Sequence, residues 1–300
     1  MKNNIKVFIF GGLGNQMFQY AAARTLAERL NADINIDTSL LYVHTKNTTP
    51  REYELNLFAL SGNREKINSS RLRGFLLLKI YPKIKNSFPG KGIARIFHLF
   101  EDKEAFNFNP EFSSLKKNSC LFGHFQSEKY FSSCENLIRE AFRFRKPFTG
   151  KNLEIAEKIK SCNAVSIHVR RGDYISNQNA AGTYAPVSTG YYEKAIKKIC
   201  NRVGNPVFFI FSDEPEKAKK EINLPQAVSI DWNTGPDNYA DMQLMSLCRH
   251  NIIANSSFSW WGAWLNENEE KIVIAPSTWL RNKETNRLIK DLIPEKWIRL

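Results

Sequence analysis

The sequence lacks the features that mark several common classes of protein. Its 300 residues include only five cysteines, an odd and widely spaced set without a Cys-x-x-Cys pair. That spacing suggests neither a disulfide framework nor a zinc site, so we expect reduced thiols. No run reaches the roughly 18 apolar residues that span a bilayer, and the apolar stretch at 6–10 is too short for a secretory signal. The sequence therefore predicts a soluble, cytoplasmic protein.

Acidic residues are scarce relative to basic ones. The chain has 43 Lys or Arg residues against 30 Asp or Glu, a formal net charge of +13. Nucleic acid, an anionic membrane face or a small phosphorylated substrate would each suit this charge. Zinc-finger spacing, an RNA-binding aromatic signature and a basic heptad region are all missing from the sequence. Nucleic acid is therefore not expected as a partner.

A local excess of positive charge lies in residues 64–95. This segment holds nine Lys or Arg residues and one acid, Glu65, interleaved with apolar residues that include Phe75 and Leu76. A surface helix near anionic lipid would have this composition, with each basic residue adding about 1 kcal/mol of attraction. A solvated basic segment would have it equally well, so both interpretations stay open.

The length and a hydrophobic content of 42% predict two globular domains of about 150 residues. In the first, a strand over 6–10, a glycine loop, a helix over 17–30 and a strand over 32–37 form half of a nucleotide-binding domain. We divide the chain into domains 1–150 and 151–300 at a segment rich in proline, glycine and charge. The second domain alternates strands at 164–169, 206–211, 227–231, 251–254 and 271–275 with helices at 190–202, 214–222, 237–249 and 258–268. This alternation predicts a parallel sheet covered on both faces.

The most informative motif is the apolar run that begins at Val165 and ends in His168, Arg170, Arg171 and Asp173. Alternating apolar residues predict a strand, and Gly172 breaks it, so two guanidinium groups are expected at a strand end. Ligands of open α/β sheets bind outside the carboxyl ends of the strands. Arginine offers five rigid donors that fit a phosphate or a carboxylate. We therefore predict an anion site here.

A glycine loop forms the second motif. Gly12 and Gly14 come directly after a strand and lead into a helix, where a phosphate can approach backbone N–H groups. The match to the dinucleotide fingerprint is partial: Met17 stands in place of the third glycine, although Asp37 lies at about the acidic spacing. A phosphate contact and a simple tight turn both remain open. Asn15 is either a cap or a hydrogen-bonding group for a ligand.

A third motif follows the predicted strand at 251–254. Asn255, Ser256, Ser257 and Phe258 surround the start of the next helix, where free N–H groups and hydroxyls form an anion cradle. Ordinary helix capping would use the same residues. The tryptophans that follow suit either a site or core packing, and for Trp264 we favour the core.

Two carboxylates complete the candidates. Asp213 follows the predicted strand at 206–211, and Asp241 lies early in the predicted helix at 237–249. Each suits hydrogen bonds from ribose hydroxyls or from the N1–H and amino group of a guanine, and each also suits a structural role. No Asp-x-Asp pair at a strand end is present to hold a divalent ion against a diphosphate. Cationic side chains such as Arg170 and Arg171 would then neutralise it.

Together these segments resemble the α-1,2-fucosyltransferases of glycosyltransferase family 11, mainly the bacterial members. Three stretches carry the resemblance: Gly11–Tyr20, His168–Tyr174 and Asn255–Leu265. Their order and spacing cover nearly the whole chain. The His-x-Arg-Arg-x-Asp segment is shared with α-1,6- and protein O-fucosyltransferases, so it indicates GDP-fucose more than a linkage.

The resemblance implies an α/β, GT-B-like architecture, with two Rossmann-like domains facing a central cleft and GDP-fucose mostly on residues 151–300. It implies inverting, metal-independent transfer of fucose from GDP-β-L-fucose to the 2-hydroxyl of a galactose. Arg170 would bind the diphosphate, His168 and Asp241 would face the nucleoside, Ser256 and Ser257 would hold phosphate, and Asn15 would reach the cleft. Asp173 is the nearest candidate for a general base and equally a candidate to orient its own turn.

The resemblance further implies a galactose-terminated acceptor, soluble or lipid-linked, as in O-antigen biosynthesis, and no cofactor beyond the donor. The basic segment 64–95 is a hypothetical contact with the inner membrane. A nicotinamide-dependent oxidoreductase is the competing enzyme class, but it requires the third glycine and gives the arginine pair no role. A basic membrane- or nucleic-acid-binding protein would explain the charge but not the three strand-end motifs.

Overall fold

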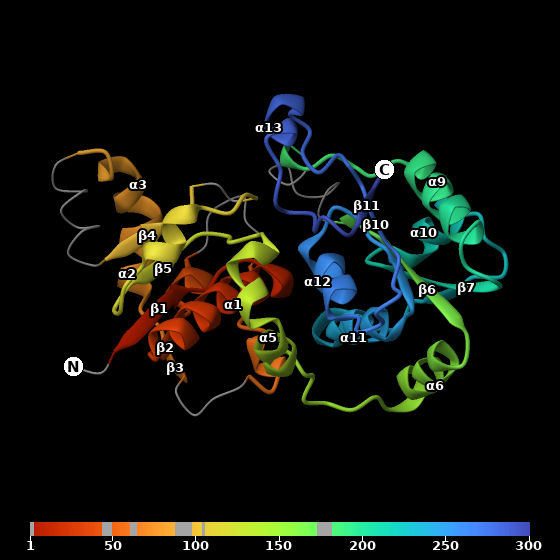
Figure 1. Cartoon of the computed structure of the whole chain (residues 1–300), viewed down its shortest axis with the longest axis horizontal. Helices are drawn as coiled ribbons and strands as arrows, with labels where there is room; N and C mark the ends of the chain where they lie inside the picture. Colours follow the sequence, from red (N-terminus) through yellow and green to blue (C-terminus); the bar gives the residue numbers. More distant parts are fainter. Residues whose placement is uncertain (1–2, 44–49, 61–64, 88–97, 104–105, 173–181) are drawn as a thin grey trace. The chain divides into compact units, whose positions relative to one another are not determined.

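The computed structural model describes residues 3–43, 50–60, 65–87, 98–103, 106–172 and 182–300 (Figure 1). Two compact units make up the chain. Unit 1 comprises Met1–Arg145 and Ile289–Leu292, and unit 2 comprises Lys146–Leu288 and Ile293–Leu300. The division falls slightly before the boundary that the sequence suggested, and a short C-terminal segment belongs to unit 1.

Unit 1 contains a five-stranded sheet in the order β3-β2-β1-β5-β4, and all its pairings are parallel. The strands are β1 (Asn4–Phe8), β2 (Asp33–Asp37), β3 (Glu65–Asn68), β4 (Leu99–Glu101) and β5 (Cys120–Phe122). The helices are α1 (Leu13–Leu30), α2 (Arg71–Phe75), α3 (Tyr81–Ile84) and α5 (Glu135–Ala141), with a π-helical turn η3 (Leu76–Ile80) between α2 and α3. Short 3-10 turns follow at η1 (Ser39–Tyr42), η2 (Leu55–Leu57), η4 (Pro110–Ser114), η5 (Glu128–Tyr130) and η6 (Ser132–Cys134).

Helix α1 fills the core of unit 1 because its apolar residues recur at helical spacing. Met17, Phe18, Ala21 and Leu26 are fully buried. Small alanines in this run let the helix lie close to the sheet. The helix begins at Leu13, earlier than the sequence indicated, because the carbonyl of Gly12 accepts the first helical hydrogen bonds.

Unit 2 contains a six-stranded, wholly parallel sheet in the order β11-β10-β9-β6-β7-β8. Its strands are β6 (Asn163–Val169), β7 (Pro206–Ser212), β8 (Val228–Ile230), β9 (His250–Ile252), β10 (Val273–Ala275) and β11 (Ile298–Arg299). Its helices are α6 (Gly150–Lys160), α9 (Thr189–Cys200), α10 (Pro215–Glu221), α11 (Tyr239–Leu247), α12 (Ser257–Leu265) and α13 (Lys283–Arg287), with a 3-10 turn η7 (Gly235–Asp237).

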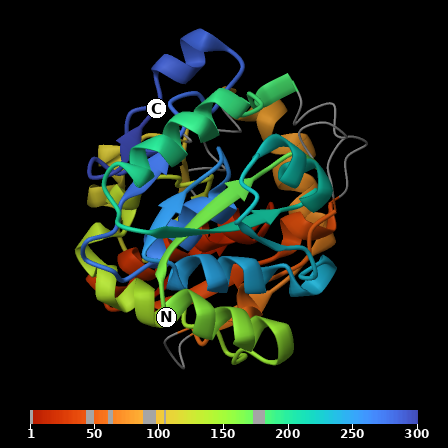
Figure 2. The same ribbon diagram turned by 90° about the vertical axis from the view of Figure 1, so that its right-hand side faces the viewer.

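The two faces of β6 serve different layers of unit 2. Val165, Ile167 and Val169 join a buried cluster with Tyr192 and Ile199 of α9. The intervening residues face the other side of the sheet, because successive side chains of a strand alternate. Figure 2 shows α9 and α6 on opposite sides of this sheet. His168 lies on the face that meets α12, where its ring is 5.8 Å from that of Phe258.

The strands and helices predicted for residues 151–300 are confirmed within a few residues at each end. The prediction for 1–37 is also confirmed, with the strands at Asn4–Phe8 and Asp33–Asp37. Residues 40–150, for which no topology was predicted, supply β3, β4 and β5. The five cysteines are all free thiols. In the part of the chain that the structure describes, no helix is long and apolar enough to cross a membrane.

Candidate functional site: the strand ends of unit 2

The sequence motifs of unit 2 meet at the carboxyl ends of three neighbouring strands. Strand β6 lies between β7 and β9. The strands β7 and β8 are added on one side of β6, and β9, β10 and β11 are then added on its other side. This is the point of an open sheet where the strand order reverses and ligands bind. His168 is the penultimate residue of β6, Arg170–Gly172 follow β6, Asp213 follows β7, and Asn255–Phe258 follow β9. The structure therefore brings these predicted site residues together.

Arg170 and Asp213 form an ion pair at this edge of the sheet. The distance between Arg170 Nε and Asp213 Oδ2 is 3.1 Å, and the side chains are 23% and 22% exposed. Asp213 also accepts hydrogen bonds of 2.9 Å from the backbone N–H groups of Arg171 and Gly172. A Cβ on Gly172 would lie 2.7 Å from the carboxylate, so this turn favours glycine. Asp213 thus fixes the turn and orients a guanidinium that solvent still reaches.

Arg171 points elsewhere. Its Nε and Nη2 lie 2.8 and 2.7 Å from Glu221 Oε2, and its own side chain is buried. Glu221 ends helix α10, so this ion pair joins that helix to the end of β6. The guanidinium of Arg171 therefore has a structural contact in this structure.

His168 is a buried histidine with an unsatisfied nitrogen. Its Nδ1 has no hydrogen-bond partner among the described residues, and its side chain is almost fully buried. Desolvation, followed by the positive charge of Arg170, lowers the pKa of His168 to about 4. The imidazole is therefore neutral at physiological pH. Leaving a buried polar atom unpaired costs about 1–3 kcal/mol, and a ligand hydrogen bond at the switch point would recover it.

Helix α12 begins beside this histidine. Ser256 is its N-cap, and its Oγ accepts a hydrogen bond of 3.3 Å from the N–H of Phe258. Asn255 is buried, and its amide donates to the carbonyls of Ala185 and Trp279 at 2.7 and 3.1 Å. Asn255 thus ties the strand end to a neighbouring loop. Ser257 and Phe258, both partly exposed, form the first turn, where N–H groups without helical partners attract anions.

The tryptophans of α12 belong to the core. Trp260 and Trp261 are fully buried and Trp264 almost so. Trp260 packs edge-to-face on Trp261 and also meets Trp297, with ring centroids 5.1 and 5.4 Å apart. These tryptophans hold α12 against the sheet. The predicted core position of Trp264 is confirmed.

Asp241 is the most perturbed carboxylate of unit 2. It lies in the first turn of α11 and is buried, and its Oδ1 accepts a hydrogen bond of 2.8 Å from Asn233 Nδ2. Desolvation raises the pKa of Asp241 to about 7, against the opposing hydrogen bond from Asn233. Sequence reasoning missed Asn233, which follows β8 in a stretch without a motif. A buried carboxylate with such a pKa is a candidate functional group, because donors from a ligand would stabilise its ionised form.

The glycine loop is in unit 1. Gly12 and Gly14 form the start of α1, as expected, and Gly11 adopts a φ of +76°, which favours glycine. Asn15 is partly exposed, and its Oδ1 accepts a hydrogen bond of 2.7 Å from Gln126 Nε2. The loop thus opens a helix at the carboxyl end of β1, and Asn15 is tied to residues that follow β5.

A cavity of about 470 Å³ lies at the carboxyl ends of the unit 1 strands. Its wall consists of Phe10, Gly11, Leu40, Leu41, Val43, Pro50, Arg51, Leu78, Glu101, Asp102, Phe122, Gly123 and His124. His124 has a buried Nδ1 without a hydrogen-bond partner among the described residues, and burial lowers its pKa to about 4. The wall is therefore mostly apolar and aromatic with a few polar groups, which is the usual make-up of a small-molecule site.

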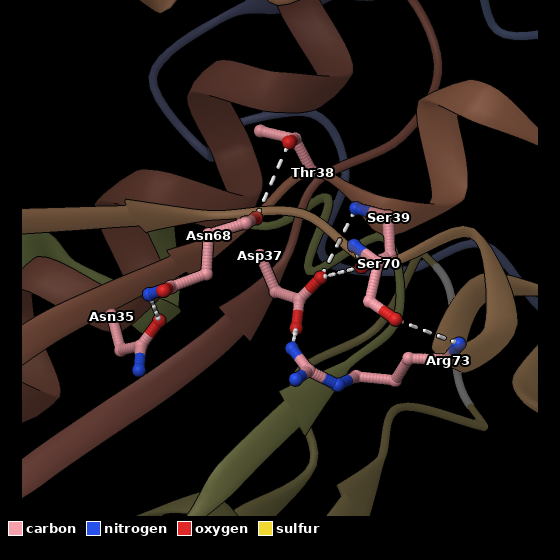
Figure 3. A network of polar contacts seen from close by, with 7 residues as sticks. All are labelled: Asn35, Asp37, Thr38, Ser39, Asn68, Ser70 and Arg73. Atoms are coloured by element: carbon pink, nitrogen blue, oxygen red, sulfur yellow. Dashed lines mark hydrogen bonds and ion pairs between the residues drawn. The ribbon is translucent and has the colours of Figure 1, made fainter.

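Asp37, at the spacing of a ribose-binding acid, has a structural place instead. It ends β2, is fully buried, and forms an ion pair with Arg73 of α2. Its Oδ1 also accepts hydrogen bonds from the N–H and hydroxyl of Ser39 (Figure 3). Its oxygens are occupied by these contacts, so Asp37 holds α2 in place.

Asp173, the proposed general base, lies outside the described residues. Within the residues that are described, no group of three or more His, Cys, Asp or Glu side chains is placed to hold a metal ion. Glu221 and His124, like Asn233, were missed by sequence analysis. Only their three-dimensional neighbours distinguish them from ordinary surface or core residues.

Comparison with known proteins decides the family. Residues 4–300 match the model of glycosyl transferase family 11. The chain belongs to this family. The resemblance seen in the three sequence stretches is thereby confirmed.

Two relatives from Escherichia coli match almost end to end. The O-antigen biosynthesis glycosyltransferase WbnK is 35% identical over 97% of this chain and 98% of its own length. An alpha-1,2-colitosyltransferase is 34% identical over 97% of this chain and 96% of its own length. The galactoside 2-alpha-L-fucosyltransferase Sec1 of Mus musculus is 32% identical, but over only 34% of this chain and 28% of its own.

Among solved structures, the fucosyltransferase NodZ from Bradyrhizobium has a TM-score of 0.52 at 14% identity. The match covers 87% of this chain and 92% of that one. At this identity the likeness shows the fold alone. The predicted fold class, an α/β GT-B-like chain with two Rossmann-like units, is confirmed.

Proposed function

We propose that this glycosyltransferase transfers L-fucose from GDP-β-L-fucose to the 2-hydroxyl of a galactose, with inversion at the anomeric carbon. The observation that carries the proposal is the partly exposed Arg170 at the switch point of unit 2, held by Asp213 beside the N-terminus of α12. The family and the activities named for its relatives support the choice of sugar and linkage.

In the proposed reaction the acceptor oxygen forms a bond to C1 of fucose while the bond from C1 to the β-phosphate oxygen breaks. The hydroxyl proton goes to a general base, for which Asp173 is the candidate to test. Negative charge develops on the departing GDP. Arg170 and the first-turn N–H group of Ser257 would stabilise that charge, and one such preorganised donor typically contributes about 3–4 kcal/mol.

We assign the nucleoside to Asp241 and His168. An ionised Asp241 would accept hydrogen bonds from the guanine N1–H and amino group, as its Oδ1 already accepts one from Asn233 Nδ2. The neutral His168, with its unpaired Nδ1, would accept one hydrogen bond from the ribose or base. Both groups would gain a partner that the folded chain itself does not supply.

The acceptor is assigned to unit 1. Its cavity combines two phenylalanines, which suit the apolar face of a sugar, with Arg51, Glu101 and His124, which suit hydroxyls. Asn15 lies in the glycine loop that contributes Gly11 to the cavity wall, and we assign its side chain to the acceptor. A galactose-terminated oligosaccharide, soluble or lipid-linked, is the proposed substrate.

The reaction is proposed to be metal-independent and cytoplasmic. The support for metal independence is that a guanidinium and a helix N-terminus occupy the place where a diphosphate would need positive charge. Turnover in the presence of a chelator tests this part: it should match turnover with added Mg²⁺.

The test of the function is a product analysis. The purified chain is incubated with GDP-fucose and a panel of β-galactosides, and the linkage is read by NMR. The proposal expects an α-1,2-fucosyl galactose. A fucosylated product with another linkage, or hydrolysis alone with every acceptor, would contradict it.

Colitose is the second candidate sugar, because the alpha-1,2-colitosyltransferase matches about as well as WbnK does. Colitose is fucose without its 3-hydroxyl, so the two donors differ by one hydrogen-bonding group. A site built to bond that hydroxyl rejects the deoxy sugar strongly, whereas an apolar site discriminates weakly. The ratio of kcat/KM for the two GDP-sugars decides between them.

A further inference from the structure

An apolar stripe faces outward on the helical segment 71–84 of unit 1. The segment runs from α2 through η3 into α3 without a break. Its exposed large apolar side chains are Leu72, Phe75, Leu76 and Ile80, with Leu72 reaching 68% exposure. Positions spaced by three and four residues share one face of a helix. A surface helix normally presents polar residues to solvent, so this face is unusual.

The opposite face of the same segment is packed into unit 1. Leu77 and Leu78 lie against the buried cluster of Phe8, Leu40 and Cys120. On α2, a Cβ at Gly74 would clash with the carbonyl oxygen of Ser39. The segment is therefore apolar on both faces, and only one of them is covered by the described residues.

Polar contacts fix the orientation of the outward face. Arg73 reaches inward to the buried Asp37, and Ser70 caps α2 by accepting a hydrogen bond from the N–H of Arg73 (Figure 3). The N–H of Ser70 donates to Ser39 Oγ at 2.7 Å. Because both ends of this short helix turn are tied to β2 and η1, Leu72 and Phe75 are held outward.

The charges around the stripe have one sign. From residue 66 to 85 the chain has six Lys or Arg residues and no acid. Arg73 and Lys85 pair with Asp37 and Glu101. The other four are exposed and form no ion pair with any residue that the structure describes: Lys66, Arg71, Lys79 and Lys83.

We propose that this face, defined as Leu72, Phe75, Leu76 and Ile80 with the cations of the same segment, Arg71, Lys79 and Lys83, docks on an anionic phospholipid surface. Apolar side chains would enter the boundary of the headgroups while the cations meet lipid phosphates. A second copy of the chain fits less well, because a symmetric contact would bring Lys79 and Lys83 close to their own copies.

Docking would also place the unit 1 cavity near the bilayer. Leu78, on the covered face of the segment, lines that cavity. An acceptor carried on a lipid would then be presented beside the proposed acceptor site. Only this last consequence rests on the proposed function; the docking itself does not.

The test is co-sedimentation of the full chain with vesicles. With about 30 mol % phosphatidylglycerol in phosphatidylcholine, we expect a partition coefficient at least 10-fold above that for phosphatidylcholine alone. Leu72→Ser/Phe75→Ser should remove most of the binding. Lys79→Glu/Lys83→Glu should weaken it about 30-fold or more, since two attractions become two repulsions. All these side chains are exposed, so the melting temperatures should match that of the unaltered chain.

A matched control lies on α6 of unit 2. Leu153→Ser/Lys158→Glu alters an exposed leucine and an exposed lysine of another surface helix and should leave binding unchanged. Binding that is absent, equal on both kinds of vesicle, or unaffected by the two segment variants would overturn the proposal. A dimer in sedimentation velocity that these variants abolish, without vesicle binding, would assign the face to a second copy and also overturn it.

Discussion

In unit 1, Asp37 at the end of β2 is fully buried and its oxygens are taken by Ser39 and Arg73. In unit 2, Asp213 at the end of β7 holds Arg170, and solvent reaches both side chains. Each unit thus places an aspartate–arginine pair where parallel strands end. In unit 1 the arginine comes from a following helix and its aspartate is fully buried, whereas in unit 2 the arginine follows the neighbouring strand and its aspartate is 22% exposed.

The contrast shows why a residue type at a strand end does not by itself identify a ligand site. What differs is the burial of the carboxylate. Asp37 is fully buried among its contacts with Ser39 and Arg73, while Asp213 and Arg170 are both partly exposed to solvent. The following changes test that difference, from the largest expected effect on stability or affinity to the smallest.

Arg73→Ala should destabilise unit 1 by about 3 kcal/mol, because it leaves a buried carboxylate without its cation. Calorimetry measures the loss, and hydrogen exchange of β2 and α2 shows which unit opens. Adding Asp37→Asn should recover more than half of the lost stability, since the buried charge is then gone. An unchanged melting temperature for Arg73→Ala would contradict the claim that the ion pair between Arg73 and Asp37 stabilises unit 1.

Arg171→Ala should destabilise unit 2 by about 2–3 kcal/mol, less than Arg73→Ala, because the carboxylate left behind is 22% exposed in Glu221 and fully buried in Asp37. The folded variant should still bind GDP with unchanged affinity, which titration calorimetry below the melting transition measures. The double variant Arg171→Ala/Glu221→Ala should regain stability. A 10-fold loss of GDP affinity in the single variant would assign Arg171 to the ligand instead.

Asp241 should make the affinity of unit 2 for GDP depend on pH. If guanine donors bind its ionised form, GDP affinity should be about 10-fold weaker at pH 6 than at pH 8, because the pKa of Asp241 is about 7. Asp241→Asn should show a smaller pH effect, leaving only the titration of the diphosphate itself. An equal pH dependence of GDP affinity in the unaltered chain and in Asp241→Asn would show that Asp241 does not bind the guanine.

The same carboxyl should affect stability without any ligand. Its pKa in the folded chain is raised above the ordinary value of 3.8, so between about pH 4 and 7 the folded state holds a proton that the unfolded state releases. Stability should therefore fall as pH rises through this window, and Asp241→Asn should remove that part of the fall.

Asp291 lies in the C-terminal segment that belongs to unit 1, and its contacts test that assignment. It accepts a hydrogen bond of 2.9 Å from the N–H of Phe108 and pairs with Lys129 at 2.7 Å. Desolvation raises the pKa of Asp291, but these contacts outweigh it and lower the pKa overall. Asp291→Ala should cost about 0.5–1 kcal/mol at pH 7. Because the folded pKa is depressed, the cost should disappear as the pH falls below the ordinary pKa of the carboxyl. A pH-independent loss would indicate packing rather than the ion pair.

Much of unit 2 was predictable because local signals and tertiary structure agree there. The alternation of Val165, Ile167 and Val169 predicted β6, and the break at Gly172 marked its end. The two-residue strand β11 and the polar strand β3 carry no such pattern. They exist because a neighbouring strand already offers unpaired N–H and carbonyl groups, which a sequence does not show.

The candidate site was predictable in its residues more than in their partners. The motifs named Arg170, Arg171 and Asp213 but not that Glu221, fifty positions away, occupies Arg171. Likewise the spacing of Asp37 suggested a ribose contact, whereas its carboxylate forms an ion pair with Arg73. Ion pairs between distant residues depend on how helices pack on the sheet, and no periodicity encodes that choice.

The most direct test of the account is the turnover of Arg170→Ala with GDP-fucose and a galactose acceptor. We predict a loss of about 100-fold or more in kcat, with an unchanged melting temperature because Asp213 keeps its backbone donors and its access to water. Arg170→Lys should recover only part of the rate, since a lysine cannot reproduce the guanidinium fork. Near-normal turnover of Arg170→Ala would contradict the claim that the open pair of unit 2 holds the departing diphosphate.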